Sequence, residues 1–279
     1  RNGFPTVQNN PDGSIFQYTV NPLGQNTEIR SATGTLVTGA TYYPNGALRR
    51  FTYGNGIVHD LAEQNLRGLP QRSKDYRGSI GILDDSYTYD AAGNVAAISD
   101  GLPGARGNRT MTYDGLDRLA SANSPMFGGT IRYSYDVLDN IATLVGPGRN
   151  LRYCYDGSNR ISFIRSGATN CTNGSATTAF AFDVQGNVQS KNAQPFVFSQ
   201  DNRLREVTNV ETYRYDAHGR RVLQWSPTVG NLLSFYNQAG QLAFQRDQRV
   251  GRNLNQAYVY LSGSLVAVRE GNYATGATT

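Results

Sequence analysis

The chain has 279 residues, of which 38% are hydrophobic and 17% charged, and its mean hydropathy is −0.49. Its 18 Tyr and 11 Phe can bury enough apolar area to exclude a disordered chain, whereas 31 Gly and few charges indicate many turns and few long surface helices. The net charge of +5 is the balance of 26 basic and 21 acidic residues. The basic residues are 24 Arg and two Lys, scattered without a basic run, which argues against nucleic-acid binding.

The sequence contains no run of 18 apolar residues, so we expect no membrane span. It opens on Arg1-Asn2-Gly3, without Met and without a signal peptide. We therefore expect a piece of a longer protein, for which the missing signal carries no information about export.

A nine-residue pattern recurs in chain order. The copies are "YTVNPLGQN" from Tyr18, "ATYYPNGAL" from Ala40, "AEQNLRGLP" from Ala62, "YTYDAAGNV" from Tyr87, "MTYDGLDRL" from Met111, "YSYDVLDNI" from Tyr133, "YCYDGSNRI" from Tyr153, "FAFDVQGNV" from Phe180, "FVFSQDNRL" from Phe196, "YRYDAHGRR" from Tyr213 and "SFYNQAGQL" from Ser234. A shortened twelfth copy, "YVYLSGSLV", begins at Tyr258. The four-residue window that starts at Asn21 in the first copy starts at Asn237 in the eleventh, so the ten steps average about 22 residues.

The four-residue window predicts a tight turn. Its fourth position is Gly, Asn or Asp in all eleven copies, the residue types that tolerate a positive φ. Its first position is Asp, Asn or Ser in ten copies, with Tyr43 as the exception, and such side chains accept a backbone N–H at the start of a turn. Both features are typical of a type I turn followed by a left-handed residue, which closes a hairpin with a G1 bulge. The clearest candidate turn residues are Asp90, Gly93, Asp114, Asp117, Asp136, Asp139, Asp156, Asn159, Asp183, Gly186, Asp216 and Gly219.

Aromatic residues precede most windows at alternate positions, so both members of a pair share one face of a strand. We expect the rings of successive repeats to stack on that face, mainly as core packing, with a sugar-binding aromatic platform as the alternative. The candidate stacked aromatics are Tyr87, Tyr89, Tyr113, Tyr133, Tyr135, Tyr153, Tyr155, Phe180, Phe182, Phe196, Phe198, Tyr213 and Tyr215.

These patterns predict an all-β fold in which tandem antiparallel hairpins form one long, curled sheet. We expect a single domain over residues 1–279, with 11 to 12 repeats and a frayed tail at residues 271–279. The free edges of such a sheet could pair with another copy.

Few residues suggest chemistry. Cys154 and Cys171 could form a local disulfide or be two unrelated thiols. His59 and His218 are the only histidines, which argues against a zinc site, and the repeated aspartates are each used by their own turn rather than by calcium. The acidic pair Asp84-Asp85 is expected on a loop. We predict no enzyme activity, no catalytic residue and no metal or cofactor site.

The pattern Y-x-Y-D-x-x-G-R/N-L at this spacing resembles the YD repeat, also called the RHS repeat, of bacterial Rhs and wall-associated proteins. The resemblance covers residues 18–270, and related repeats occur in toxin-complex C subunits and in teneurins. It implies a β-sheet strip that spirals into a hollow shell, secreted or displayed on a bacterial surface. In toxin members, such a shell encloses a C-terminal polymorphic toxin and ends in a core with an Asp-based self-cleavage site. No such motif precedes Thr279, so no catalytic residue is carried over.

Two functions are compatible with these observations. The first is a structural segment of a shell that contains and delivers a toxin lying further along its own chain. The second is a surface module that binds glycans or another cell through exposed aromatics. The first predicts a core motif and a variable toxin downstream of Thr279, and the second predicts binding to glycans that is lost when surface tyrosines are removed.

Overall fold

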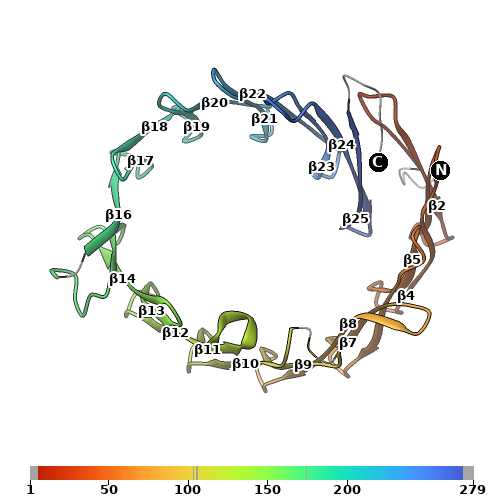
Figure 1. Cartoon of the computed structure of the whole chain (residues 1–279), viewed down its shortest axis with the longest axis horizontal. Helices are drawn as coiled ribbons and strands as arrows, with labels where there is room; N and C mark the ends of the chain where they lie inside the picture. The colour runs from red at the N-terminus through yellow and green to blue at the C-terminus, as the bar shows by residue number, and fades with distance from the viewer. Residues whose placement is uncertain (1–5, 103, 105, 174, 273–279) are drawn as a thin grey trace. The chain divides into compact units, whose positions relative to one another are not determined.

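The computed structural model describes residues 6–102, 104, 106–173 and 175–272, labelled by element in Figure 1. These residues form β-strands joined by short turns, with one 3-10 helix, η1 (Pro125–Phe127), among them. The predicted all-β class is confirmed. The chain divides into two compact units, one made of Arg1–His59 with Pro195–Thr279 and the other of Asp60–Gln194.

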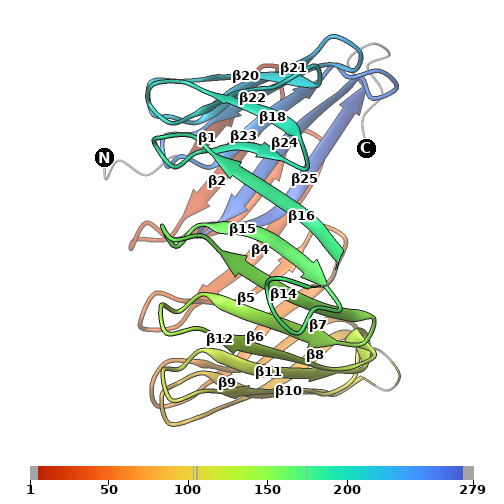
Figure 2. The ribbon, with the colours of Figure 1, turned by 90° about the vertical axis from the view of Figure 1, so that its left-hand side faces the viewer.

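The unit Asp60–Gln194 is a meander in which each strand from β7 to β17 pairs antiparallel with the next along the chain. In Figure 2, the consecutive strands β12, β11 and β10 lie one below another. The strands are β6 (Val58–Gln64, which begins in the other unit), β7 (Pro70–Arg77), β8 (Ile80–Tyr89), β9 (Val95–Asp100), β10 (Arg109–Tyr113), β11 (Leu119–Ser124), β12 (Gly129–Tyr135), β13 (Ile141–Gly146), β14 (Arg149–Tyr155), β15 (Ile161–Ser166), β16 (Ser175–Phe182) and β17 (Val188–Lys191).

The two faces of this meander differ in chemistry because side chains alternate along each strand. Tyr133 lies opposite Leu144, which lies opposite Leu151, so one face is aromatic and aliphatic. The adjacent row carries hydroxyl and guanidinium groups, since Ser134 lies opposite Thr143. Hydroxyl pairs such as Ser134–Thr143 (2.6 Å) and Thr112–Ser121 (2.7 Å) join neighbouring strands on the second face.

The other unit combines two meanders from distant parts of the sequence, β1 to β5 and β18 to β25, each with consecutive antiparallel pairs. The strands are β1 (Val7–Asn9), β2 (Ile15–Val20), β3 (Asn26–Ser31), β4 (Gly34–Tyr42), β5 (Leu48–Tyr53), β18 (Gln194–Phe198), β19 (Leu204–Val207), β20 (Glu211–Tyr215), β21 (Arg221–Ser226), β22 (Gly230–Tyr236), β23 (Leu242–Asp247), β24 (Leu254–Leu261) and β25 (Ser264–Asn272).

The main buried core lies in this second unit. Side chains from β2 to β5 form one cluster with side chains from β23 and β24, each at most 5% exposed. The cluster consists of Phe16, Ile29, Val37, Ala40, Phe51, Phe244, Ala257, Val259 and Leu261. Polar contacts flank it: Tyr42 Oη lies 2.8 Å from Ser262 Oγ, and Arg269 Nη1 donates to Asp12 Oδ2 at 3.0 Å. The two meanders therefore bury one another's apolar faces.

Three details differ from the sequence-based expectation. Asp84 and Asp85 lie within strand β8 rather than on a loop, and because side chains alternate along a strand, they point to opposite faces. Gly271 and Asn272, expected in a frayed tail, are the last residues of β25, and residues 273–279 lie outside the described part. Two further turns of the same type were missed, closed by Gly13 and Gly56, whose N–H groups donate to the carbonyls three residues earlier.

Candidate functional site

The eleven windows form turns that share one backbone geometry. At every fourth position φ is positive, between 58° at Asp117 and 97° at Gly93, and the three Asp and Asn positions other than Asp117 have φ of 58–67°. Every fourth-position N–H donates to the carbonyl of its first position, and every first-position N–H donates to the carbonyl of the fifth residue. A register shift precedes the turn, as between Thr88 and Tyr89, which gives the bulged hairpin that the turn chemistry requires.

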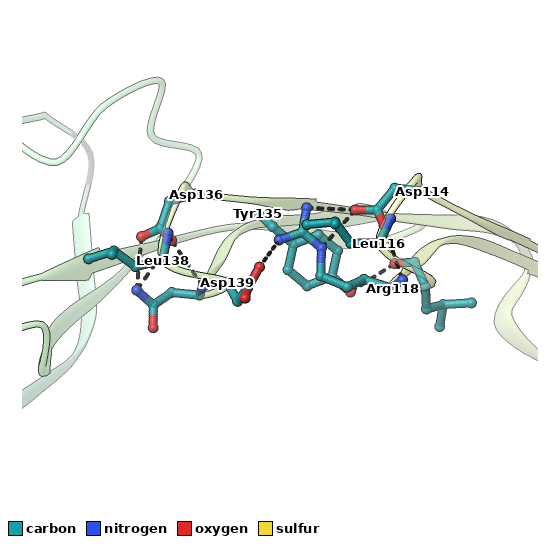
Figure 3. Close-up of polar contacts among 9 residues, drawn as sticks. Asp114, Leu116, Arg118, Tyr135, Asp136, Leu138 and Asp139 are labelled. Carbon is teal, nitrogen blue, oxygen red and sulfur yellow. Dashed lines mark hydrogen bonds and ion pairs between the residues drawn. The ribbon is translucent and has the colours of Figure 1, made fainter.

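The first-position carboxylate satisfies the backbone of its turn. Asp114 Oδ1 accepts the N–H groups of Leu116 at 2.9 Å and Arg118 at 3.0 Å, and Asp136 Oδ1 accepts those of Leu138 and Asn140 (Figure 3). The same pair of bonds forms at Asp156, Asp183 and Asp216. These carboxylates are therefore capping groups, and their oxygens are occupied by their own turns.

In most turns the fifth residue connects the turn to the next one, a role that the sequence analysis did not predict. Arg118 donates from Nε to Asp114 Oδ2 at 2.8 Å, from Nη1 to Asp139 of the following turn, and lies 4.4 Å from the centre of the Tyr135 ring (Figure 3). We call such a fifth residue a clasp. Asn140 is a clasp of a second kind, whose Nδ2 donates to Asp136 Oδ2 at 3.0 Å and to Asn159 Oδ1 at 2.6 Å.

The links form a continuous series in one of the two units. In Asp60–Gln194 they run from the turn at Asn65 to the turn at Asp183, through Arg67 (a third-position residue), Asn94, Arg118, Asn140 and Arg160. In the other unit, the clasps of the last turns are Arg203, Arg220 and Gln241. The nine-residue copies already contain this position, which is Arg, Asn or Gln in nine of the eleven, but the sequence alone did not show that it reaches the next turn.

Where the second aromatic of a pair is Tyr, its hydroxyl makes a link in the opposite direction. Tyr135 Oη donates to the carbonyl of Leu119 at 2.9 Å, the first residue of the return strand in the preceding hairpin. Equivalent bonds of 2.5–3.0 Å join Tyr42, Tyr89, Tyr113, Tyr155, Tyr215, Tyr236 and Tyr260 to the first residue of a return strand. Where both groups are present, as in the hairpin that contains Asp136, a hairpin is tied to its predecessor by a tyrosine hydroxyl and to its successor by a clasp.

The expected ring-on-ring stacking does not describe these aromatics. Among the described residues, the ring pairs in contact are Phe51–Tyr53, Phe51–His59 and Phe235–Phe244, and none joins two of the thirteen candidates. The reason is spacing, because equivalent strands of successive hairpins are separated by a return strand and so lie about 10 Å apart, beyond the roughly 4.5–7 Å of aromatic pairs. Guanidinium groups occupy the interval instead.

Hydrogen bonding and burial set the protonation of these groups. The hydrogen bond from Arg118 holds the pKa of Asp114 below its usual range, and the amides of Asn140 and Asn187 do the same for Asp136 and Asp183. Burial raises the pKa of the Tyr18 hydroxyl to about 12. The turn carboxylates are therefore ionised and the tyrosine hydroxyls protonated at neutral pH.

Cys154 and Cys171 are joined by a disulfide, with their Cα atoms 5.7 Å apart. Cys154 lies in β14 and is 3% exposed, whereas Cys171 lies in the loop between β15 and β16. The bond fixes that loop against the sheet.

No cluster of three or more His, Cys, Asp or Glu suited to a metal occurs in the part of the chain that the structure describes. Within the same residues, no helix is long and apolar enough to cross a membrane.

Comparison with known proteins identifies relatives of this arrangement. A family model described as the teneurin YD-shell matches residues 65–243. Among solved structures, the chain resembles TcdB2–TccC3 without its hypervariable C-terminal region, with 16% identity, a TM-score of 0.59 and 95% of this chain covered. It also resembles a mutant Photorhabdus luminescens Tc holotoxin pore, with 17% identity, a TM-score of 0.52 and 98% of this chain covered. A third similar structure is the TcdB2–TccC3–Cdc42 complex, with 16% identity, a TM-score of 0.51 and 98% of this chain covered. The chain spans 14% of each of these chains, and such low identity shows a common fold alone. No curated protein matches the chain.

Proposed function

Because this chain belongs to the teneurin YD-shell family, we propose that it is a section of the wall of a shell that encloses the C-terminal part of its own longer chain. The enclosed part is a toxin domain, and the wall keeps it from the cell that makes it until delivery. The role of the section is structural and non-catalytic. The protein acts outside the cytoplasm, at the cell surface or after secretion, where an oxidising environment keeps the Cys154–Cys171 disulfide intact.

The observation that carries this proposal is the two-way coupling of successive hairpins. A meander one layer thick has little core behind it, and a single hairpin is marginal in water. Ties such as Tyr135 to Leu119 and Arg118 to Asp139 hold neighbouring hairpins together without a second layer. A wall built in this way stays continuous while leaving one face free to surround cargo.

The resemblance to TcdB2–TccC3 supports the same role, since that protein is described by a hypervariable C-terminal region. A shell that encloses different toxins needs a wall built from the same repeated contacts and an enclosed segment that can vary. The proposal predicts that the coding sequence continues beyond Thr279 into a core motif and a variable toxin. A stop codon directly after Thr279 would end the proposal for this protein.

The decisive experiment is protease protection in the full-length protein. The C-terminal segment is expected to resist a protease that digests the same segment expressed alone. Removing two clasps, Arg118→Ala with Arg220→Ala, should open the wall and increase the cleavage rate, whereas Arg50→Ala, an exposed arginine on β5, should not. Equal cleavage of the enclosed and isolated segments would contradict containment.

A further inference from the structure

The sheet has a strongly basic area where β12 to β15 run side by side. These four strands contain Arg132, Arg149, Arg152 and Arg165 and no Asp or Glu. The nearby turn carboxylates lie beyond the other ends of the strands and are bound by their own turns and clasps, as at Asp136 and Asp156. The area therefore carries positive charge that its own strands do not neutralise.

Two of these arginines face each other directly. Arg152 on β14 lies opposite Arg165 on β15, so their Cβ atoms are about 4.5–5.5 Å apart and their like charges destabilise the pair. The Arg165 guanidinium lies 5.3 Å from the centre of the Phe163 ring, which orients it on this face.

Arg152 has unused hydrogen-bonding capacity. Its Nε is buried and has no hydrogen-bond partner, and within the described part of the chain Arg152 forms no ion pair. Elsewhere in the same unit, Arg72 donates from both Nε and Nη2 to the carboxylate of Asp84, at 2.8 and 2.9 Å. Arg152 thus presents the same two-donor fork, with its buried Nε lacking a hydrogen-bond partner.

The disulfide-held loop lies beside this pair. Cys154 follows Arg152 by two residues, so both side chains emerge on the same face of β14, where Cys171 is bonded to it. The loop is also anchored by the N–H of Gly167, which donates to the carbonyl of Asn150 at 2.9 Å, and its Ala168 is buried. The loop is therefore held beside β14, the strand that carries Arg152.

We propose that Arg152 and Arg165, flanked by the loop at residues 167–173, form a binding site for a phosphate or sulfate group. Guanidinium forks match the oxygens of such groups, and a dianion between two arginines replaces their repulsion with two charge-assisted contacts. Arg132, exposed on the same face two strands away, adds to the attraction. This site does not depend on the shell function proposed above.

The test compares thermal unfolding of the whole chain in phosphate, sulfate and chloride at equal ionic strength and pH 7. Binding to the folded state raises the Tm with the logarithm of phosphate concentration, whereas chloride should have little effect. In Arg152→Gln, the phosphate-dependent rise should disappear and phosphate affinity measured by calorimetry should fall at least about tenfold. The matched control Arg50→Gln, which removes one exposed positive charge, should behave like the wild type.

A second readout separates binding from a structural role. In chloride, Arg152→Gln should have a Tm equal to or above that of the wild type, because the substitution removes a repulsion. A lower Tm of this variant in every anion, or equal effects of phosphate and chloride on the wild type, would overturn the proposal. Arg152→Lys keeps the charge without the fork and should bind phosphate more weakly than the wild type.

The source of the group can be assigned with the same assay. If glycerol phosphate raises the Tm of the protein as much as inorganic phosphate does at equal concentration, the site accepts a phosphate group carried on a larger molecule. Stabilisation by the inorganic ion alone indicates a site for the free ion.

Discussion

At the fourth position of each turn, the backbone dihedral alone decides which residues are accepted. Gly186 has φ of 89°, and no atom lies within 4 Å of the point where a Cβ would stand. The turn at Asn159 reaches φ of 60° with a side chain present. Conformational strain, rather than crowding, therefore limits substitution at Gly186.

If backbone strain rather than crowding is limiting, two substitutions at Gly186 should differ in their cost. Gly186→Ala should lower the free energy of unfolding by about 1–2 kcal/mol, since the left-handed region penalises an ordinary Cβ. Gly186→Asn should cost clearly less, because Asn tolerates this region and occupies it in other turns of the chain. Urea denaturation of the two variants measures the difference, and equal losses would show that the dihedral is not the limiting factor.

The tyrosine hydroxyls allow a matched test of the link between hairpins. Tyr135→Phe removes only the oxygen that donates to the Leu119 carbonyl and should cost about 0.5–1.5 kcal/mol. Phe182 occupies the equivalent position without a hydroxyl, below Arg160, whose guanidinium lies 5.0 Å from the ring centre. Phe182→Tyr should gain part of that energy by donating to the carbonyl of Ile161.

Chemical denaturation checks both variants, and hydrogen exchange at the strand that begins with Leu119 or Ile161 locates the change. If Phe182→Tyr raised the free energy of unfolding while Tyr135→Phe did not lower it, the effect would come from ring packing and not from the hydrogen bond.

At the scale of the element, each turn with Asp at its first position contains a carboxylate whose protonation affects the stability of the turn. The carboxylates at the first positions have lowered pKa values because hydrogen bonds from clasps favour the charged form, as at Asp136 and Asp183. A lowered pKa in the folded state gives stability that is present above the unfolded value of about 4 and is lost as the pH falls through the folded value. The turns should therefore weaken in acid and not at neutral pH.

The corresponding prediction is that the Tm is nearly constant from pH 7 to about pH 5 and falls steeply below pH 4. The double variant Asp136→Asn with Asp183→Asn should have a shallower acid decline, because Asn caps a turn without titrating, as Asn65 and Asn237 already do. Circular dichroism melts across this pH range measure both slopes. Identical acid slopes in the two proteins would place the acid sensitivity outside these turns.

At the scale of the whole molecule, most strands rely on neighbours within the sheet, whereas the ends of the chain rely on a shared core. Phe244 on β23 is fully buried in the cluster that includes Phe16 and Ile29, more than 200 residues earlier in the sequence. The strands at the two ends of the described chain therefore stabilise each other.

Phe244→Ala should lower the free energy of unfolding by about 3–5 kcal/mol, through lost burial and the cavity left behind. The structure also predicts that amide hydrogen exchange accelerates in β3 and β4, far from the substitution in sequence. Phe127→Ala, at an exposed ring in η1, is the control and should leave those amides protected. Faster exchange confined to β22–β24 would contradict the shared core.

The sequence by itself determined the local events: where the chain turns, which residues take a positive φ, and that each aromatic pair shares a face. These are decided within four or five residues, so the side chains at Asp90 and Gly93 are sufficient to specify them. The sequence was also sufficient to predict the all-β class and the repeat family, because both follow from the recurrence of those turns.

Only the tertiary structure decided how the repeats are joined. The link from Arg118 to Asp139 depends on how far apart successive turns lie, which the strand register and bulges set together. The same strand spacing prevents the rings from stacking and leaves room for a guanidinium. The burial of Phe16 against Phe244 and the opposition of Arg152 to Arg165 likewise depend on register and packing, which no local pattern of residues encodes.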